Sequence, residues 1–214
     1  MTKPAILALA ALAAATMACD LNMTRGEGDM TSETRVVGDF SRIETGAAID
    51  VDVRIGPGST LEVRGQSNIV PIIVTDVANG TLRIRSDHGY TSTERVEVVL
   101  TAAHLDGIVL SGGSHGRIEG LDTAAFRIEA SGGSRVTASG SAGTLALEMS
   151  GGSAAELADL STETITLDLS GGCRAELRAS DHVNGSATGG SRASILGNAQ
   201  ISVTTTGDSQ VGPT

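Results

Sequence analysis

The 214-residue sequence has almost no aromatic side chains: it contains no Trp, one Tyr and two Phe. Aromatic rings supply much of the apolar bulk of most globular cores, so the core here must be built from small aliphatic side chains. A regular repeat allows this, because each unit presents the same narrow cross-section to the next. The length suits one such domain together with a targeting segment.

Basic residues are also scarce, and Lys3 is the only lysine. The formal net charge is −10. An acidic chain repels phosphate backbones, so we expect no nucleic-acid partner. The same charge disfavours adsorption to anionic lipid headgroups, which leaves a covalent lipid as the route to a membrane.

No hydrophobic run is long enough to span a bilayer. Residues 5–15 form an apolar stretch of Ala, Leu and Ile behind Lys3, which is typical of a secretory signal peptide. Cys19 follows a small residue and resembles the acylated cysteine of a bacterial lipobox, although Thr16 stands where Leu is usual. The sequence predicts a signal peptide over residues 1–18 and lipidation of Cys19, with ordinary cleavage at the same place as the alternative.

The localisation follows from this N-terminus. If Cys19 is lipidated, Asp20 resembles the signal that keeps lipoproteins in the inner membrane, facing the periplasm. Display on the cell surface or secretion is the alternative. Cys173 is the only other cysteine; a lipid on Cys19 would leave it free, so we expect no disulfide.

Residues 19–34 are polar and lack periodicity, which indicates a flexible tether. Strands are expected from Arg35 onward, where residues 49–55, 61–64 and 82–85 alternate between apolar and polar. No segment has the period of an amphipathic helix. We therefore expect one all-β domain over residues 35–214.

The C-terminal half repeats a corner of the type Ser-Gly-Gly-Ser every 18 to 20 residues. The corners begin at Ser111, Ser131, Ser150, Ser170, Thr188 and Thr206. Two adjacent glycines permit a sharp bend with positive φ. This period predicts a right-handed parallel β-helix, or β-solenoid, with one coil per repeat.

Apolar columns flank each corner and predict the inward-facing ladders of that solenoid. After the corners the columns are Gly116/Ile118, Val136/Ala138, Ala155/Leu157, Ala175/Leu177 and Ala193/Ile195. Before the corners they are Phe126/Ile128/Ala130, Leu145/Leu147/Met149, Ile165/Leu167/Leu169, Val183/Gly185/Ala187 and Ile201/Val203/Thr205. Stacked coils would place equivalent residues about 4.8 Å apart.

Three features carry a family resemblance: residues 40–53, the segment Asn79-Gly80-Thr81-Leu82 and the Ser-Gly-Gly-Ser repeats. They resemble the auto-transporter adhesin head GIN domain family, from about Arg35 to the C-terminus. The family often has Ser-Gly-Ala-Ser corners, and the last corner here departs to Thr206-Gly207-Asp208-Ser209. The resemblance implies a β-helical adhesive head and no particular ligand.

Residues with catalytic chemistry are few. The histidines form no close-spaced metal pattern, and there is no nucleophile elbow, phosphate-binding loop or zinc spacing. We predict no catalytic residue and no cofactor. The histidines are His88, His104, His115 and His182.

Two charged columns remain. Glu129, Glu148 and Asp168 precede successive corners and would stack as an acidic ladder, a weak candidate for a Ca²⁺ site. Arg135, Arg174 and Arg192 form a basic column just after the corners. We favour simple charge balance between the two columns around the bend.

These observations favour a non-catalytic binding or adhesion module of the cell envelope whose ligand is an unidentified protein or surface glycan. A carbohydrate-active β-helix enzyme is one alternative, disfavoured because sugar-stacking aromatics are missing. A structural or signalling-associated lipoprotein that binds another protein is the other.

Overall fold

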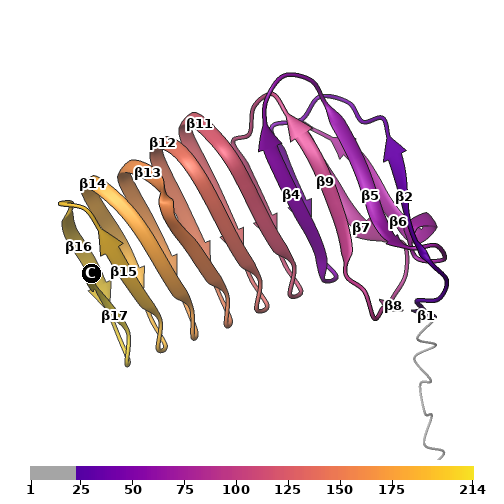
Figure 1. Cartoon of the computed structure of the whole chain (residues 1–214). Coiled ribbons are helices and arrows are strands. Elements are labelled where there is room, and N and C mark those ends of the chain that lie inside the picture. Colours follow the sequence, from indigo (N-terminus) through magenta and orange to yellow (C-terminus); the bar gives the residue numbers. More distant parts are fainter. Residues whose placement is uncertain (1–22) are drawn as a thin grey trace, which may run out of the picture.

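The computed structural model describes residues 23–214, so the predicted signal peptide and Cys19 lie outside the described part (Figure 1). Within it the chain is all-β apart from one short 3₁₀ helix, and no helix there is long and apolar enough to cross a membrane. The elements are β1 (Thr24–Arg25), β2 (Met30–Arg35), β3 (Arg42–Thr45), β4 (Ile49–Ile55), β5 (Thr60–Gln66), η1 (Val70–Ile72), β6 (Ile73–Ala78), β7 (Thr81–Ser86), β8 (Tyr90–Thr91), β9 (Val96–Ala102), β10 (Gly107–Leu110), β11 (His115–Ala130), β12 (Arg135–Met149), β13 (Ala154–Leu169), β14 (Arg174–Ala187), β15 (Arg192–Leu196), β16 (Gln200–Thr205) and β17 (Gln210–Pro213).

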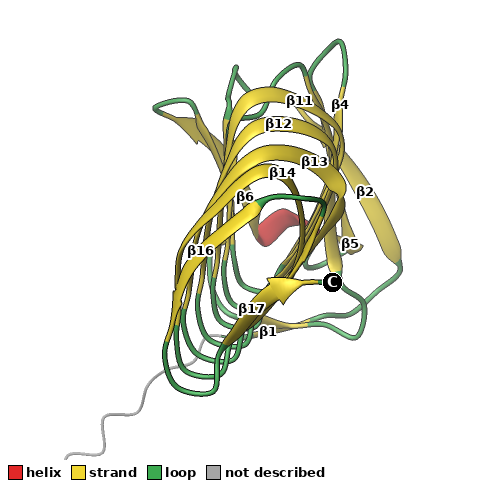
Figure 2. Cartoon of the chain, turned by 90° about the vertical axis from the view of Figure 1, so that its left-hand side faces the viewer, coloured by secondary structure: helices red, strands yellow, loops and turns green. Residues whose placement is uncertain are grey.

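The C-terminal half is the expected β-solenoid. Strands β11 to β14 pair in parallel, each with the next, and β15, β16 and β17 continue the stack. Figure 1 shows the coils side by side, and Figure 2 shows them nearly superimposed when viewed along the stack. The register confirms a coil of 18 to 20 residues, because it aligns His115, Arg135, Ala154, Arg174, Arg192 and Gln210.

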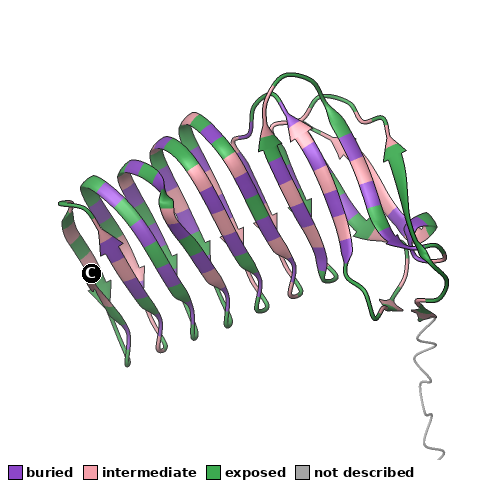
Figure 3. Ribbon diagram, viewed as in Figure 1, coloured by how far each residue is buried: buried purple, intermediate pink, exposed green. Residues whose placement is uncertain are grey.

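The predicted ladders are confirmed in register and, over most of their length, in burial. Phe126, Leu145, Ile165 and Val183 are successive neighbours, and each is at most 2% exposed. Figure 3 shows buried and exposed positions alternating along each strand. The prediction is wrong for Ile201, Val203 and Thr205, which are half-buried or exposed since they lie in the outermost described coil, and for Gly185, which is half-buried.

Each coil contains one long bent strand rather than two separate strands. Register shifts mark the bends, for example between Leu157 and Ser161 where β13 meets β14. The bend brings a third set of small or apolar side chains inward, which the sequence analysis did not identify. This set comprises Leu121, Ala142, Leu160, Thr162 and Ala179.

The N-terminal half completes the same sheet without the repeat. Strand β10 pairs with β3 and strand β11 with β4, so the solenoid continues into a 15-stranded sheet. There β6, β5 and β2 add antiparallel pairs to the parallel ones. Asn79-Gly80 is the short turn between the antiparallel strands β6 and β7. Gly56-Pro57-Gly58 instead links β4 to β5, which lie on either side of β9.

The expected tether over residues 19–34 is wrong in its C-terminal part. Strand β1 pairs with β8, and β2 pairs antiparallel with β5 from Met30 opposite Gln66 to Arg35 opposite Leu61. Arg35 also donates from Nη2 to the carbonyl of Val70 at 3.0 Å. The side chains of β2 are mostly exposed, so backbone pairing rather than apolar burial holds the strand, and no hydrophobic period marks it.

The corners explain the paired glycines. The first glycine of each corner has positive φ, for example +92° at Gly171, where an added Cβ would lie 2.6 Å from the carbonyl oxygen of Gly151. Gly172 has no such constraint, and a Cβ there would meet nothing closer than 3.8 Å. The fourth residue closes the turn, as when Ser153 Oγ donates to the Ser150 carbonyl at 2.9 Å.

Replacing Gly171 with Ala should therefore destabilise the protein by roughly 2 kcal/mol or more, since both the backbone conformation and the neighbouring carbonyl oppose a Cβ. Gly172→Ala is the matched control, and its effect should stay within about 0.5 kcal/mol. Denaturant unfolding of both variants measures the difference. Equal losses would show that the two glycines serve the corner alike.

Candidate binding groove and charged ladders

The acidic ladder stacks as predicted. Glu129, Glu148 and Asp168 are neighbours on β11, β12 and β13. Their partner differs from the one expected: Arg127 contacts Glu129 through Nε and Glu148 through Nη2, both at 2.7 Å. Arg127 lies two residues before Glu129 on the same face of its strand, so charge balance comes from along the strand and not from across the corner.

These contacts leave the ladder poorly suited to a cation. Two of its three carboxylates share one guanidinium, and Asp168 accepts a hydrogen bond from Ser186 Oγ at 3.0 Å. Over residues 23–214, no three carboxylate, imidazole or thiol groups lie together as a metal ion would require.

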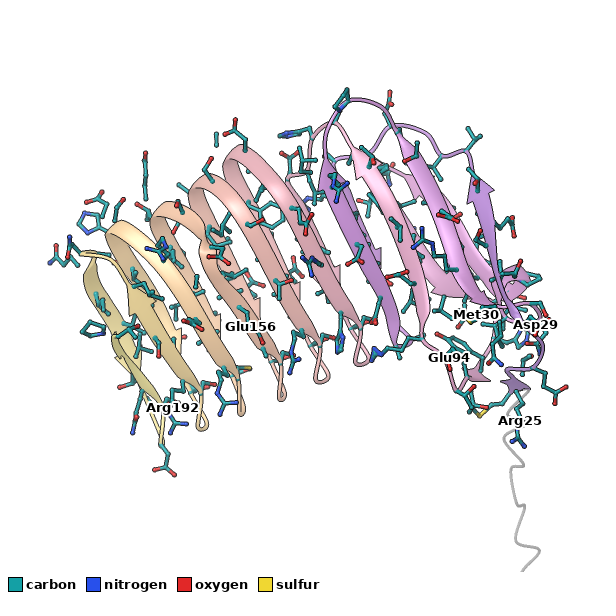
Figure 4. The ribbon with its side chains drawn as sticks, in the orientation of Figure 1. Arg25, Asp29, Met30, Glu94, Glu156 and Arg192 are labelled. Carbon is teal, nitrogen blue, oxygen red and sulfur yellow. The ribbon has the colours of Figure 1, made fainter. Side chains whose placement is uncertain are left out.

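The basic column is less regular than predicted. Arg174 and Arg192 are direct neighbours, but Ala154 separates Arg174 from Arg135. Arg135 Nε lies 3.6 Å from an oxygen of Glu156, on the same outward face (Figure 4 labels Glu156 and Arg192). Both groups of this pair are more than half exposed, and pairs of this kind contribute about 0–1 kcal/mol.

The histidines are dispersed, as the sequence indicated. His88 hydrogen-bonds Thr24 Oγ1 at 2.7 Å, so it helps to hold β1. The others each face one carboxylate, and none lies beside a serine or cysteine nucleophile. The pairs are His104 with Asp106, His115 with Asp50 and His182 with Asp181.

Cys173 replaces the last serine of a corner and keeps its role there. Its thiol is 1% exposed and donates to the Ser170 carbonyl at 3.2 Å. Burial raises the pKa of this thiol. The protonated form is a weak nucleophile, so the geometry favours a structural role for Cys173.

A groove that the sequence pattern did not predict crosses five coils. Its volume is about 680 Å³, within the range of about 300–1,000 Å³ usual for ligand sites. Strands β11 to β14 bend at the end of the cross-section away from the corners (Figure 2). The residues that line the groove lie at these bends and in the turn after β15. One rim is a column formed by Asp122, Ser141, Ser161 and Arg178.

The residues beneath the groove are small. Ala142, Thr162 and Ala179 line it and are buried, at 3%, 5% and 1% exposure. Each repeat has a run of Ser, Thr, Ala and Gly between its two apolar halves, and this run is the sequence signal for the groove. The periodicity of the ladders does not by itself indicate a binding site there.

Several polar groups on the rims keep free hydrogen-bonding capacity. Ser141 Oγ donates to Asp122 Oδ1 at 3.1 Å, and Arg178 Nε donates to the carbonyl of Ala158 at 2.6 Å. The second bond fixes the guanidinium and leaves its terminal nitrogens unused. Ser161, Glu163 and Asn198 are exposed, and their side chains make no hydrogen bond to the described part of the chain.

A second, smaller depression of about 300 Å³ lies over β4 and β9 and includes Asp52. Burial raises the pKa of Asp52, and Glu97 raises it further through a hydrogen bond and charge repulsion, while Arg117 opposes the shift. Folding thus favours the protonated form of Asp52. The stabilisation is present below the ordinary pKa and is lost as the pH rises through the raised value.

Asp52→Asn should accordingly raise Tm at neutral pH and leave it close to wild type at about pH 3, where the wild-type carboxyl is protonated. Glu62→Gln is the control, because contact with Arg64 shifts the pKa of Glu62 in the opposite direction, downward. That variant should not gain stability at neutral pH. Thermal unfolding of both across the pH range tests the difference, and a pH-independent gain in Asp52→Asn would contradict it.

Comparison with known proteins agrees with this architecture. A "putative adhesin" from Bacteroides fragilis is 19% identical, with a TM-score of 0.70 over 89% of this chain and 99% of that one. A "putative adhesin" from Parabacteroides merdae is 14% identical, with a TM-score of 0.57 over 90% and 99%. A "putative lipid binding protein" from Parabacteroides distasonis is 13% identical, with a TM-score of 0.54 over 90% and 99%. At these identities the likeness concerns the fold.

No curated protein matches the chain at a significant level. A family model does match, over residues 39–199, which cover most of the solenoid and of the N-terminal sheet. The chain therefore belongs to the family described as "putative auto-transporter adhesin, head GIN domain".

Proposed function

We propose that this protein is a non-catalytic binding module of the cell envelope, of adhesion type, which contacts its ligand along the groove over β11 to β14. The groove carries this proposal, because it places polar side chains from five coils along one continuous sheet. The family description and the two solved structures named as adhesins support it.

The groove's residues favour binding over chemistry. No histidine, cysteine or lysine lines it, so it holds neither an activated nucleophile nor a base of the usual kinds. Its two carboxylates, Asp122 and Glu163, are both exposed. These features disfavour the alternative of a polysaccharide-active enzyme.

A capture experiment tests the binding function. The full chain, purified in detergent and coupled to beads, should retain envelope vesicles of the producing bacterium and cells whose outer membrane has been permeabilised to expose the periplasm. Ser161→Leu places an apolar side chain in the groove, and it should reduce retention at least tenfold. Thr166→Leu, an exposed position on the same strand outside the groove, is the control and should retain as wild type does. Wild-type beads that retain neither material would contradict the proposal.

We further propose that Cys19 carries a lipid and holds the domain at the inner membrane, facing the periplasm. The acidic composition supports a covalent anchor, since no basic patch is available for headgroups. Cys19→Ser should move the protein from the membrane to the soluble fraction without changing its unfolding temperature, because residue 19 precedes the first strand. Mass spectrometry of wild type without an added lipid would show conventional secretion instead.

A further inference from the structure

We infer that the groove binds a neutral, hydroxyl-rich glycan chain that runs along the solenoid axis and is held by hydrogen bonds, since no aromatic ring lines the groove. This inference rests on the proposed binding function and assigns the class of ligand to the same site. It follows from the hydrogen-bonding groups that the groove presents and from the kinds of ligand that its lining disfavours.

The backbone in the middle of the groove is largely engaged within the sheet. Along the rim, Asp122 pairs with Ser141, Ser141 with Ser161 and Ser161 with Arg178, although register shifts interrupt the ladders beside these residues. Strands β12 and β13 have a paired neighbour on each side. A peptide cannot join these two strands as an additional strand, which is the usual way for a sheet to bind an extended peptide. Recognition there must come from side chains.

The side chains offer both donors and acceptors. Asp122 and Glu163 provide carboxylate oxygens, while the terminal nitrogens of Arg178 and the amide of Asn198 provide donors. The Ser161 hydroxyl can donate or accept a hydrogen bond. A sugar hydroxyl also donates and accepts at once, so a chain of hydroxyl groups matches a rim that carries both kinds of group.

Charge and shape exclude the other extended ligands. Two carboxylates and one guanidinium give the groove a negative balance, in a chain of net charge −10, so an acidic polymer is repelled. An acyl chain needs a deep apolar channel, whereas the floor consists of Ala and Thr. The large exposed apolar side chains of residues 23–214 are Met23, Met30 and Val36, all N-terminal; Figure 4 labels Met30 at the opposite end of the molecule from the solenoid.

The groove is also suited to several sugar units. It spans five coils, which is four inter-strand steps of about 4.8 Å each. Equivalent rim positions recur at each step, so successive units of a polymer meet side chains at a constant interval. A monosaccharide would use only a part of this length.

The direct test is titration of the full chain with three neutral oligosaccharides: chitohexaose, maltohexaose and mannohexaose. We expect at least one to bind, by calorimetry and by saturation-transfer NMR, with an affinity that stays within twofold between about 0.05 and 0.5 M NaCl. Ser161→Leu should weaken binding at least tenfold, and Thr166→Leu should not. Glu163→Gln should weaken it severalfold, while Glu176→Gln, an exposed acid outside the groove, should have no effect.

The outcomes separate this inference from the proposed function. If beads capture cells but none of the hexasaccharides binds, and capture survives periodate treatment of the cells but not protease treatment, the ligand is a protein and the glycan inference is wrong. If a hexasaccharide binds equally to wild type and Ser161→Leu, the groove is not its site. If neither capture nor oligosaccharide binding occurs, the binding function is wrong as well.

Discussion

Parallel strands that pair residue against residue force every coil of this solenoid to present the same cross-section as its neighbours. An aromatic ring in one coil would need matching space in the next coil. This explains why aromatic residues are nearly absent. It also explains why Phe126 lies among aliphatic neighbours in the first long coils. The same demand fixes the corners, because successive turns must lie flat against each other. Gly171 and Gly151 approach too closely there for a Cβ.

Because the backbone and the inward side chains hold the fold, the outward positions are free to serve other purposes. Many carry ion pairs between residues two apart on one strand, such as Arg117 with Glu119 at 2.7 Å and Arg127 with Glu129. Exposed pairs contribute about 0–1 kcal/mol each, so they set the surface charge more than the stability. The groove belongs to this outward set, and its rim can change without disturbing the ladders.

Sequence periodicity was sufficient for the coil length, the ladder register and the burial of most ladder residues, since a stacked repeat repeats its constraints in the sequence. It was insufficient where backbone pairing or contacts between neighbouring strands determine the structure. Strand β2 has no apolar period to mark it. The contact of Arg127 with the acidic ladder runs along the strand to Glu129, whereas the repeat suggested partners across the corner. Small residues line the groove beside the register shifts, and residues such as Ala142 and Thr162 carry no distinctive pattern.

The pairing of the first strands has a mechanical consequence. A lipid on Cys19 and a ligand in the groove would pull on the chain from either side of strands β2, β5, β9 and β4, so the load would pass through their ladders in turn. The shortest pairing near the anchor is the two-residue contact of β1 with β8, followed by the six pairs of β2 with β5. Under tension these would open first and lengthen the attachment, while the coils that carry the groove remain folded.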